Sequence, residues 1–123
     1  MIGEIRKIIT PYYDMALGKK SFKSRPALII AQADAGDYVV LPVSRVTRRE
    51  NLHLIYDVEV DPAEYPELNL KDISYVRTHK QTIVHESEIL SVYRDMKKHY
   101  AELYLEVLTK REKFSAEITS QAL

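Results

Sequence analysis

Residues 18–31 read GKKSFKSRPALIIA, a basic segment that leads directly into an apolar one. The apolar part, from Pro26 to Ala33, is nearly continuous, which predicts a central strand of a sheet. Arg25 lies at the junction, and the proline after it favours an extended backbone at this arginine. The sequence therefore predicts a guanidinium group held at the start of a central strand.

A turn and a second apolar segment follow this strand. Ala35-Gly36-Asp37 predicts a tight turn, and residues 38–43 (YVVLPV) predict the antiparallel partner strand. In a hairpin the end of the second strand lies beside the start of the first. The pairing therefore predicts that Ser44 lies near Arg25.

The rest of the chain adds short strands and one helix. Residues 2–9 are rich in β-branched side chains and predict a first strand that ends at Thr10-Pro11, followed by a long loop over residues 12–23. Later expected strands cover residues 54–60, 73–77, 82–85 and 91–96. From Lys97 to Ser120 there is no glycine or proline, and apolar residues recur at helical spacing, which predicts one helix.

This order of elements predicts a mainly β fold with a C-terminal helix. We expect one domain over residues 1–123, with a small, strongly curved β-barrel over about residues 1–96 and the helix, about residues 97–120, packed on it. The apolar face of the helix either packs entirely on its own barrel or extends beyond it and serves in association.

Composition excludes several classes of protein. There are no cysteines, so disulfides and thiolate metal sites are excluded. No apolar run is long enough to span a bilayer, and no signal peptide is recognisable, so we expect a cytoplasmic protein that does not bind membranes. The formal net charge is zero, yet residues 1–56 hold nine basic and five acidic residues. This asymmetry indicates either one basic face or ordinary solvated loops.

Three elements of the predicted topology bring chemically useful side chains together. They are Arg25, Ser44 and the segment Arg77-Thr78-His79-Lys80. No carboxylate is expected among them, which favours an anionic ligand, and phosphate suits the planar fork of arginine. The four histidines show no spacing typical of metal ligands, so we expect neither a metal nor another cofactor.

RNA is a phosphate substrate that can be cut without a metal, because its own 2′-hydroxyl is the nucleophile. Fixed cations would stabilise the phosphorane, and His79 would serve as acid or base near neutral pH. Taken singly, each residue has an ordinary structural alternative. His79 would bind backbone carbonyls in a loop, Arg25 would form a surface ion pair, and Ser44 would close the end of a strand.

Four short segments, taken in order, are similar to the motifs of one protein family. They read IGEI at residues 2–5, RPALII at 25–30, LPVS at 41–44 and VRT at 76–78. The set resembles the PemK/MazF family of toxin endoribonucleases from bacterial toxin–antitoxin systems, over about residues 2–110. Three positions depart from the family pattern: Ser74 and Tyr75 replace an Asp-Gln pair found in many members, and His79 replaces an acid found in some.

The resemblance implies an SH3-like barrel, a homodimer and metal-independent cleavage of single-stranded RNA to a 2′,3′-cyclic phosphate and a 5′-hydroxyl. It also implies a protein antitoxin that occupies the RNA groove. Arg25 would be the main phosphate-stabilising and proton-transferring residue, Ser44 would take the place of the catalytic Thr or Ser, and Arg77 would be a second functional arginine. Together with His79 these are the expected catalytic residues.

Further side chains are expected to contact the RNA. They are Lys19, Lys20, Lys23, Ser24, Arg45, Thr78 and Lys80. The alternative to an enzyme is a non-catalytic module that holds RNA or a peptide without cutting it, with the basic residues supplying affinity.

Overall fold

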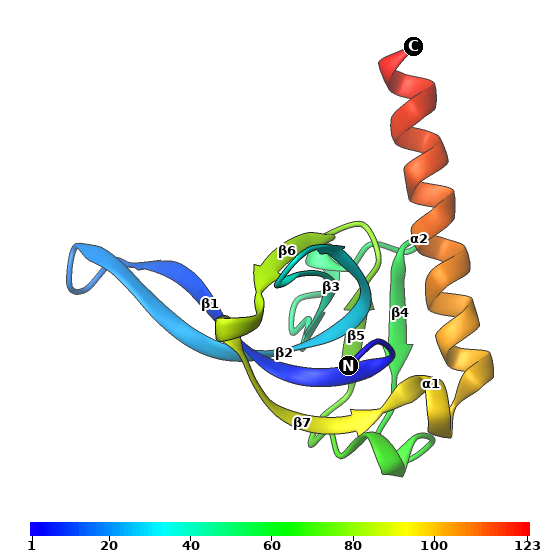
Figure 1. Ribbon diagram of the computed structural model, residues 1–123, viewed down its shortest axis with the longest axis horizontal. Coiled ribbons are helices and arrows are strands. Elements are labelled where there is room, and N and C mark those ends of the chain that lie inside the picture. Colours follow the sequence, from blue (N-terminus) through cyan, green and yellow to red (C-terminus); the bar gives the residue numbers. More distant parts are fainter.

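The computed structural model describes all 123 residues, arranged as one curled antiparallel sheet with helices at the C-terminal end. Its strands are β1 (Glu4–Asp14), β2 (Lys19–Asp34), β3 (Asp37–Ser44), β4 (Asp57–Val60), β5 (Ser74–Arg77), β6 (Thr82–His85) and β7 (Ile89–Asp95). The helices are α1 (Met96–His99) and α2 (Ala101–Ala122), with short 3-10 turns at Arg49–Asn51, Pro66–Leu68 and Glu86–Glu88. Figure 1 shows the sheet curled into a half-barrel, with α2 along one side.

β2 is the central strand, as its apolar sequence predicts. It pairs with β1 on one side and with β3 on the other. Leu28 and Ile29 are both fully buried, and they belong to two different hydrophobic clusters. Because successive side chains of a strand point to opposite faces, β2 contributes to a core on each side of the sheet.

β3 produces the curl of the sheet because its two halves have different partners. Its first half, Asp37–Val40, pairs with β6, whereas Val43 and Ser44 pair with Val76 and Tyr75 of β5. The predicted β2–β3 hairpin is confirmed, with Ala27 opposite Pro42. β3 therefore leaves β2 just before Ser44, and the sheet folds over at that point.

The expected loop over residues 12–23 is wrong. β1 continues through Pro11 to Asp14, β2 begins at Lys19, and the two strands pair without a break. β7 pairs with β1 only as far as Ile8, and β3 pairs with β2 only from Ala27. Residues 9–24 therefore form a two-stranded arm that projects from the body (Figure 1). Pro11 is tolerated because the outer edge of β1 has no partner there.

The expected strand over residues 54–60 is correct only from Asp57 onward. His53 shapes the preceding segment into a turn, because its Nδ1 accepts the backbone N–H groups of Ile55 and Tyr56, each at 3.3 Å. The Asp57 N–H in turn donates to the His53 carbonyl at 3.0 Å. These side-chain bonds replace the strand pairing that the apolar residues of this segment suggest.

The single expected helix is interrupted at Tyr100, which has φ −140° and ψ 66°. Its ring packs edge-on against Tyr65 at 5.0 Å between centroids, and its hydroxyl accepts the Glu67 N–H at 3.0 Å. A tertiary contact, not a glycine or proline, therefore divides α1 from α2.

α2 packs on the body through only one part of its surface. Leu103, Tyr104 and Val107 are buried in the larger core cluster, whereas Leu105 is exposed. The C-terminal half of the helix extends beyond the sheet (Figure 1). No helix in the structure combines the length and the apolar composition needed to cross a bilayer.

Candidate functional site

An open groove of about 910 Å³ lies at the base of the arm. Its walls come from β1 and β2 where the arm begins, from the end of β3, from the loop before β5 and from the middle of β7. Only four of its sixteen lining residues are hydrophobic. The groove is therefore a polar surface suited to a hydrated or charged ligand.

The groove is strongly cationic although the whole chain is neutral. One carboxylate, that of Asp72, lines it, against five cationic side chains: Lys7, Lys23, Arg25, Arg45 and Lys71. Asp72 Oδ2 lies 3.2 Å from Arg45 Nη1, but the two side chains are 58% and 67% exposed, so water screens this pair. The other four cations have no carboxylate partner, which leaves their charge available to an anion.

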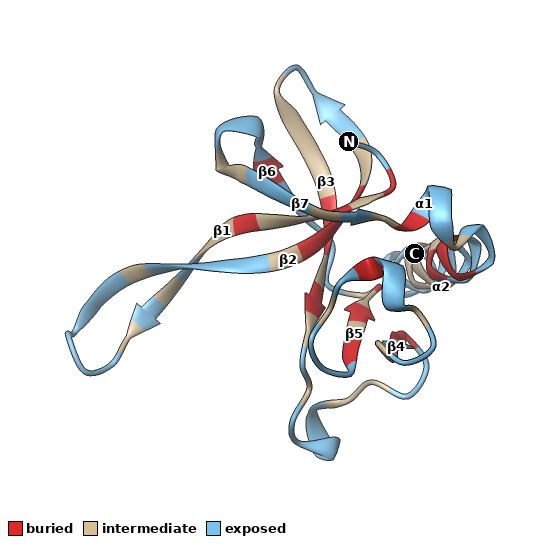
Figure 2. Ribbon diagram, turned by 90° about the horizontal axis from the view of Figure 1, so that it is seen from below, coloured by how far each residue is buried: buried red, intermediate tan, exposed pale blue.

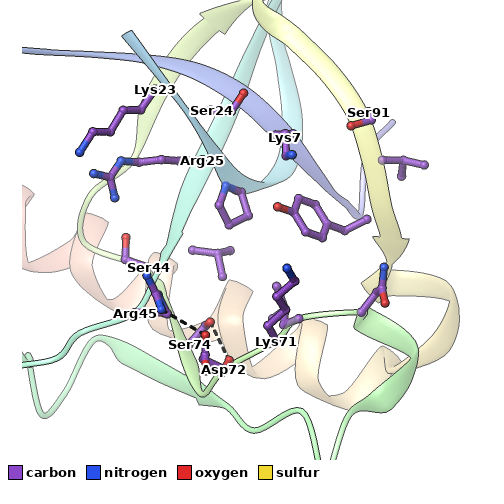
Figure 3. A pocket seen from close by; sticks show the side chains of 16 residues that line it. Lys7, Lys23, Ser24, Arg25, Ser44, Arg45, Lys71, Asp72, Ser74 and Ser91 are labelled. Atoms are coloured by element: carbon purple, nitrogen blue, oxygen red, sulfur yellow. Dashed lines mark hydrogen bonds and ion pairs between the residues drawn. The ribbon is translucent and has the colours of Figure 1, made fainter. Parts of the chain in front are cut away.

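Arg25 and Ser44 lie in this same groove, as the hairpin pairing predicts. Arg25 is exposed and makes no ion pair, so its guanidinium is free to bind a ligand. Figure 3 shows Lys23 and Arg25 at the same end of the groove as Ser44, with Lys7 and Lys71 farther along. Ser24 and Arg45, both expected RNA contacts, also line it.

Arg77 does not join this groove, so the expected convergence of three elements is wrong. Its Nε lies 3.1 Å from Asp57 Oδ1 and its Nη2 lies 3.3 Å from Asp57 Oδ2. Nη2 also donates to the Asn51 carbonyl at 3.0 Å. The cause is strand register: Arg77 of β5 lies directly opposite Asp57 of β4, whose side chain is fully buried. Arg77 therefore compensates a buried charge.

Thr78 and His79 belong to the same region as Arg77. Thr78 is fully buried and its hydroxyl donates to the Tyr56 carbonyl at 2.6 Å, so its side chain is not exposed to a ligand in this structure. His79 Nδ1 lies 3.8 Å from Asp57 Oδ1, too far for a hydrogen bond, and has no other partner. The imidazole lies near the rings of His53, Tyr56 and Phe114. The expectation that no carboxylate accompanies these residues is also wrong.

The remaining expected contacts lie outside the groove lining. Lys80 is exposed, on the turn that follows β5. Lys19 and Lys20 are exposed on the arm. The sequence interpretation missed Lys7 and Lys71. Lys7 is placed by its position opposite Pro26, which requires the β1–β2 register, and Lys71 lies in a loop without a motif.

Burial lowers the pKa of His79 below its usual value, and the nearby carboxylate of Asp57 only partly offsets this. The His79 side chain is only 11% exposed, so a charged imidazolium there would lack most of its hydration, and the folded protein favours the neutral form. His79 is therefore poorly suited to act as an acid, and it does not line the groove.

This depressed pKa makes the stability of the fold depend on pH. Because the unfolded chain protonates His79 at about pH 6.5, the stabilising effect is complete above that pH and is lost as the pH falls below it. We expect His79→Gln to show a smaller decrease in unfolding free energy between pH 7.5 and 5.5 than the wild type. Urea denaturation at both pH values measures this. His99→Gln, at an exposed histidine, serves as the control. An unchanged pH dependence in His79→Gln would contradict the assignment.

Comparison of the chain with the known protein families finds no match. Comparison with curated protein sequences finds none either.

Proposed function

We propose that the groove binds the backbone of single-stranded RNA and that the protein is a metal-independent endoribonuclease. The observation that carries this proposal is the concentration of five cations, together with Ser44, in one open groove of a neutral chain. Such a group of cations suits phosphodiesters, because each phosphate carries a full negative charge and has oxygen atoms that accept hydrogen bonds.

The reaction proceeds by attack of a ribose 2′-oxygen on the adjacent phosphorus, with departure of the 5′-oxygen. The products are a 2′,3′-cyclic phosphate and a 5′-hydroxyl, and the proton lost by the 2′-hydroxyl is balanced by the one gained at the 5′-oxygen. Arg25 stabilises the charge on the phosphorane, and the Ser44 hydroxyl donates to a phosphate oxygen. The resemblance to PemK/MazF toxins assigns proton transfer to Arg25 as well.

A second candidate function is a non-catalytic RNA- or peptide-binding module. One observation favours it: no imidazole lines the groove, and its one carboxylate is paired with Arg45. Incubation of the purified protein with single-stranded RNA in EDTA, followed by analysis of the product ends, separates the two. Cyclic phosphate ends support the endoribonuclease. Binding without cleavage assigns the groove to the binding module.

The proposal includes the wider biology that the resemblance implies. The fold is an SH3-like barrel of PemK/MazF type, the protein acts in the cytoplasm as a homodimer, and a protein antitoxin inhibits it by covering the groove. Sedimentation tests the dimer: a monomer at the concentration at which RNA is cleaved would remove it from the proposal.

Salt dependence of binding tests whether the groove cations contact phosphates. Each phosphate neutralised on a single strand contributes about 0.7 to the slope of log affinity against log salt. We expect Lys7→Ala and Lys71→Ala each to reduce the slope by about this amount. Lys113→Ala, at an exposed position on α2, should leave it unchanged. Filter binding of a 2′-O-methyl RNA at several salt concentrations provides the measurement, and slopes equal to wild type would contradict the proposed contacts.

A further inference from the structure

The arm, residues 9–24, is a regular structure that leaves unusual side chains in solvent. Its strands pair in one register from Ile5 opposite Leu28 to Asp14 opposite Lys19. Asp14 Oδ1 fixes the turn by accepting the N–H groups of Ala16 and Leu17 at 3.0 and 3.1 Å. Figure 2 shows that the outer part of the arm is exposed. The arm has no third strand to cover its large apolar side chains, which makes it a candidate contact surface.

Two aromatic rings on the arm lie on the face of the ribbon that carries Lys7 of the groove, whereas Lys23 and Arg25 reach the groove from the other face. Tyr13 and Phe22 are 61% and 64% exposed. The unbroken register places Phe22 opposite Pro11 and Tyr13 opposite Lys20. Residues opposite each other share a face, and this alternation continues inward to Lys7, which lines the groove. Tyr13 and Phe22 are thus diagonal neighbours on one surface, which we call the aromatic platform.

The charge of the arm selects an anionic ligand for this platform. Lys19, Lys20 and Lys23 are exposed, and the single acid of the arm, Asp14, is engaged in the turn. Lys23 Nζ lies 4.5 Å above the Tyr12 ring, on the opposite face of the ribbon, and also lines the groove. Exposed rings flanked by cations suit single-stranded nucleic acid, whose bases stack on the rings while its phosphates meet the lysines. An acidic peptide would use the lysines but has no comparable use for the rings.

We propose that Tyr13 and Phe22 stack with bases of the single-stranded RNA whose backbone lies in the groove, so that the arm extends the binding site outward. This inference rests on the proposed function, because it requires RNA as the ligand. Stacking is tolerant of sequence, since every base has a π-face. The platform therefore supplies affinity for the strand rather than choice of the cleaved sequence.

Leucine substitutions separate stacking from simple apolar contact. Tyr13→Leu and Phe22→Leu keep the apolar bulk and the charge but remove the ring. We expect each to weaken binding of a 2′-O-methyl RNA by about 5- to 150-fold, the range for one stacked base, without changing the salt slope. Tyr13→Phe and Phe22→Tyr should bind like the wild type. Lys20→Ala should reduce the slope, and Ile83→Ala, exposed on β6, should change neither quantity.

The outcomes distinguish this inference from the proposed function. A wild type that does not bind RNA overturns both. A wild type that binds RNA, with leucine variants that bind equally well, overturns the platform alone. If polyglutamate displaces the RNA and the leucine variants lose polyglutamate binding by the same factor, the arm is a site for an acidic protein, and the inference is wrong. Hydrogen exchange of the arm amides verifies that each variant keeps the hairpin. If one leucine variant unfolds the arm, the leucine variant at the other ring carries the test.

Discussion

Replacement of Arg25 by alanine is expected to reduce RNA cleavage by at least about 100-fold and to leave the fold intact. The side chain is exposed and forms no ion pair, so its removal creates no cavity and leaves no buried charge. Loss of one fixed donor aimed at the charge of a transition state costs about 100- to 1000-fold in rate. Initial rates on single-stranded RNA in EDTA and a thermal unfolding curve measure the two effects.

Two companion variants make this test specific. Arg48→Ala removes another exposed arginine, one that does not line the groove, and should cleave like the wild type. Arg25→Lys keeps a charge but not the planar fork, and should fall between the wild type and alanine. A variant Arg25→Ala that unfolds, or that cleaves at the wild-type rate, would show that this arginine has been assigned the wrong role.

The largest expected effect on stability is at Asp57. Replacement by alanine should lower the free energy of unfolding by about 3 kcal/mol, the lower end of the range for one partner removed from a buried ion pair. The lower end applies because the Arg77 side chain remains 21% exposed and can recover some hydration. The substitution also removes the acceptor for the His53 N–H, which lies 2.8 Å from Asp57 Oδ2. Urea denaturation at pH 7.5 measures the loss.

Asp72→Ala is the matched control, because its pair with Arg45 is exposed and should contribute less than about 1 kcal/mol. Arg77→Ala should also destabilise the fold, yet cleavage per folded molecule should stay near that of the wild type. Equal unfolding free energies for Asp57→Ala and the wild type would contradict this account. Loss of cleavage in folded Arg77→Ala would instead return Arg77 to the catalytic residues.

The sequence by itself determined the central strand, the hairpin and the C-terminal helix, because each of these depends on residues that follow one another in the chain. The apolar run after Arg25-Pro26 specified a central strand because such a run fits a strand that is covered on both faces, and Leu28 and Ile29 are buried in clusters on opposite faces. The turn at residues 35–37 and the second apolar run specified the hairpin, and the hairpin placed Ser44 in the groove with Arg25. The apolar spacing after Lys97 specified the helix, though not its interruption at Tyr100.

Only the tertiary structure decided two features. One is the extended arm, and the other is the position of Arg77, Thr78 and His79 outside the groove. No residue of the arm belongs to the hydrophobic core, so its sequence shows no alternation of apolar and polar residues by which a strand could be recognised. Arg77 and His79 lie near the groove-forming strands in sequence, but the register of β4 against β5 places a buried carboxylate, Asp57, beside Arg77. A buried charge must be compensated. Arg77 therefore pairs with Asp57 and does not reach the groove. Arg25 has no such partner, and it stays available to a ligand because no acid faces it across the sheet.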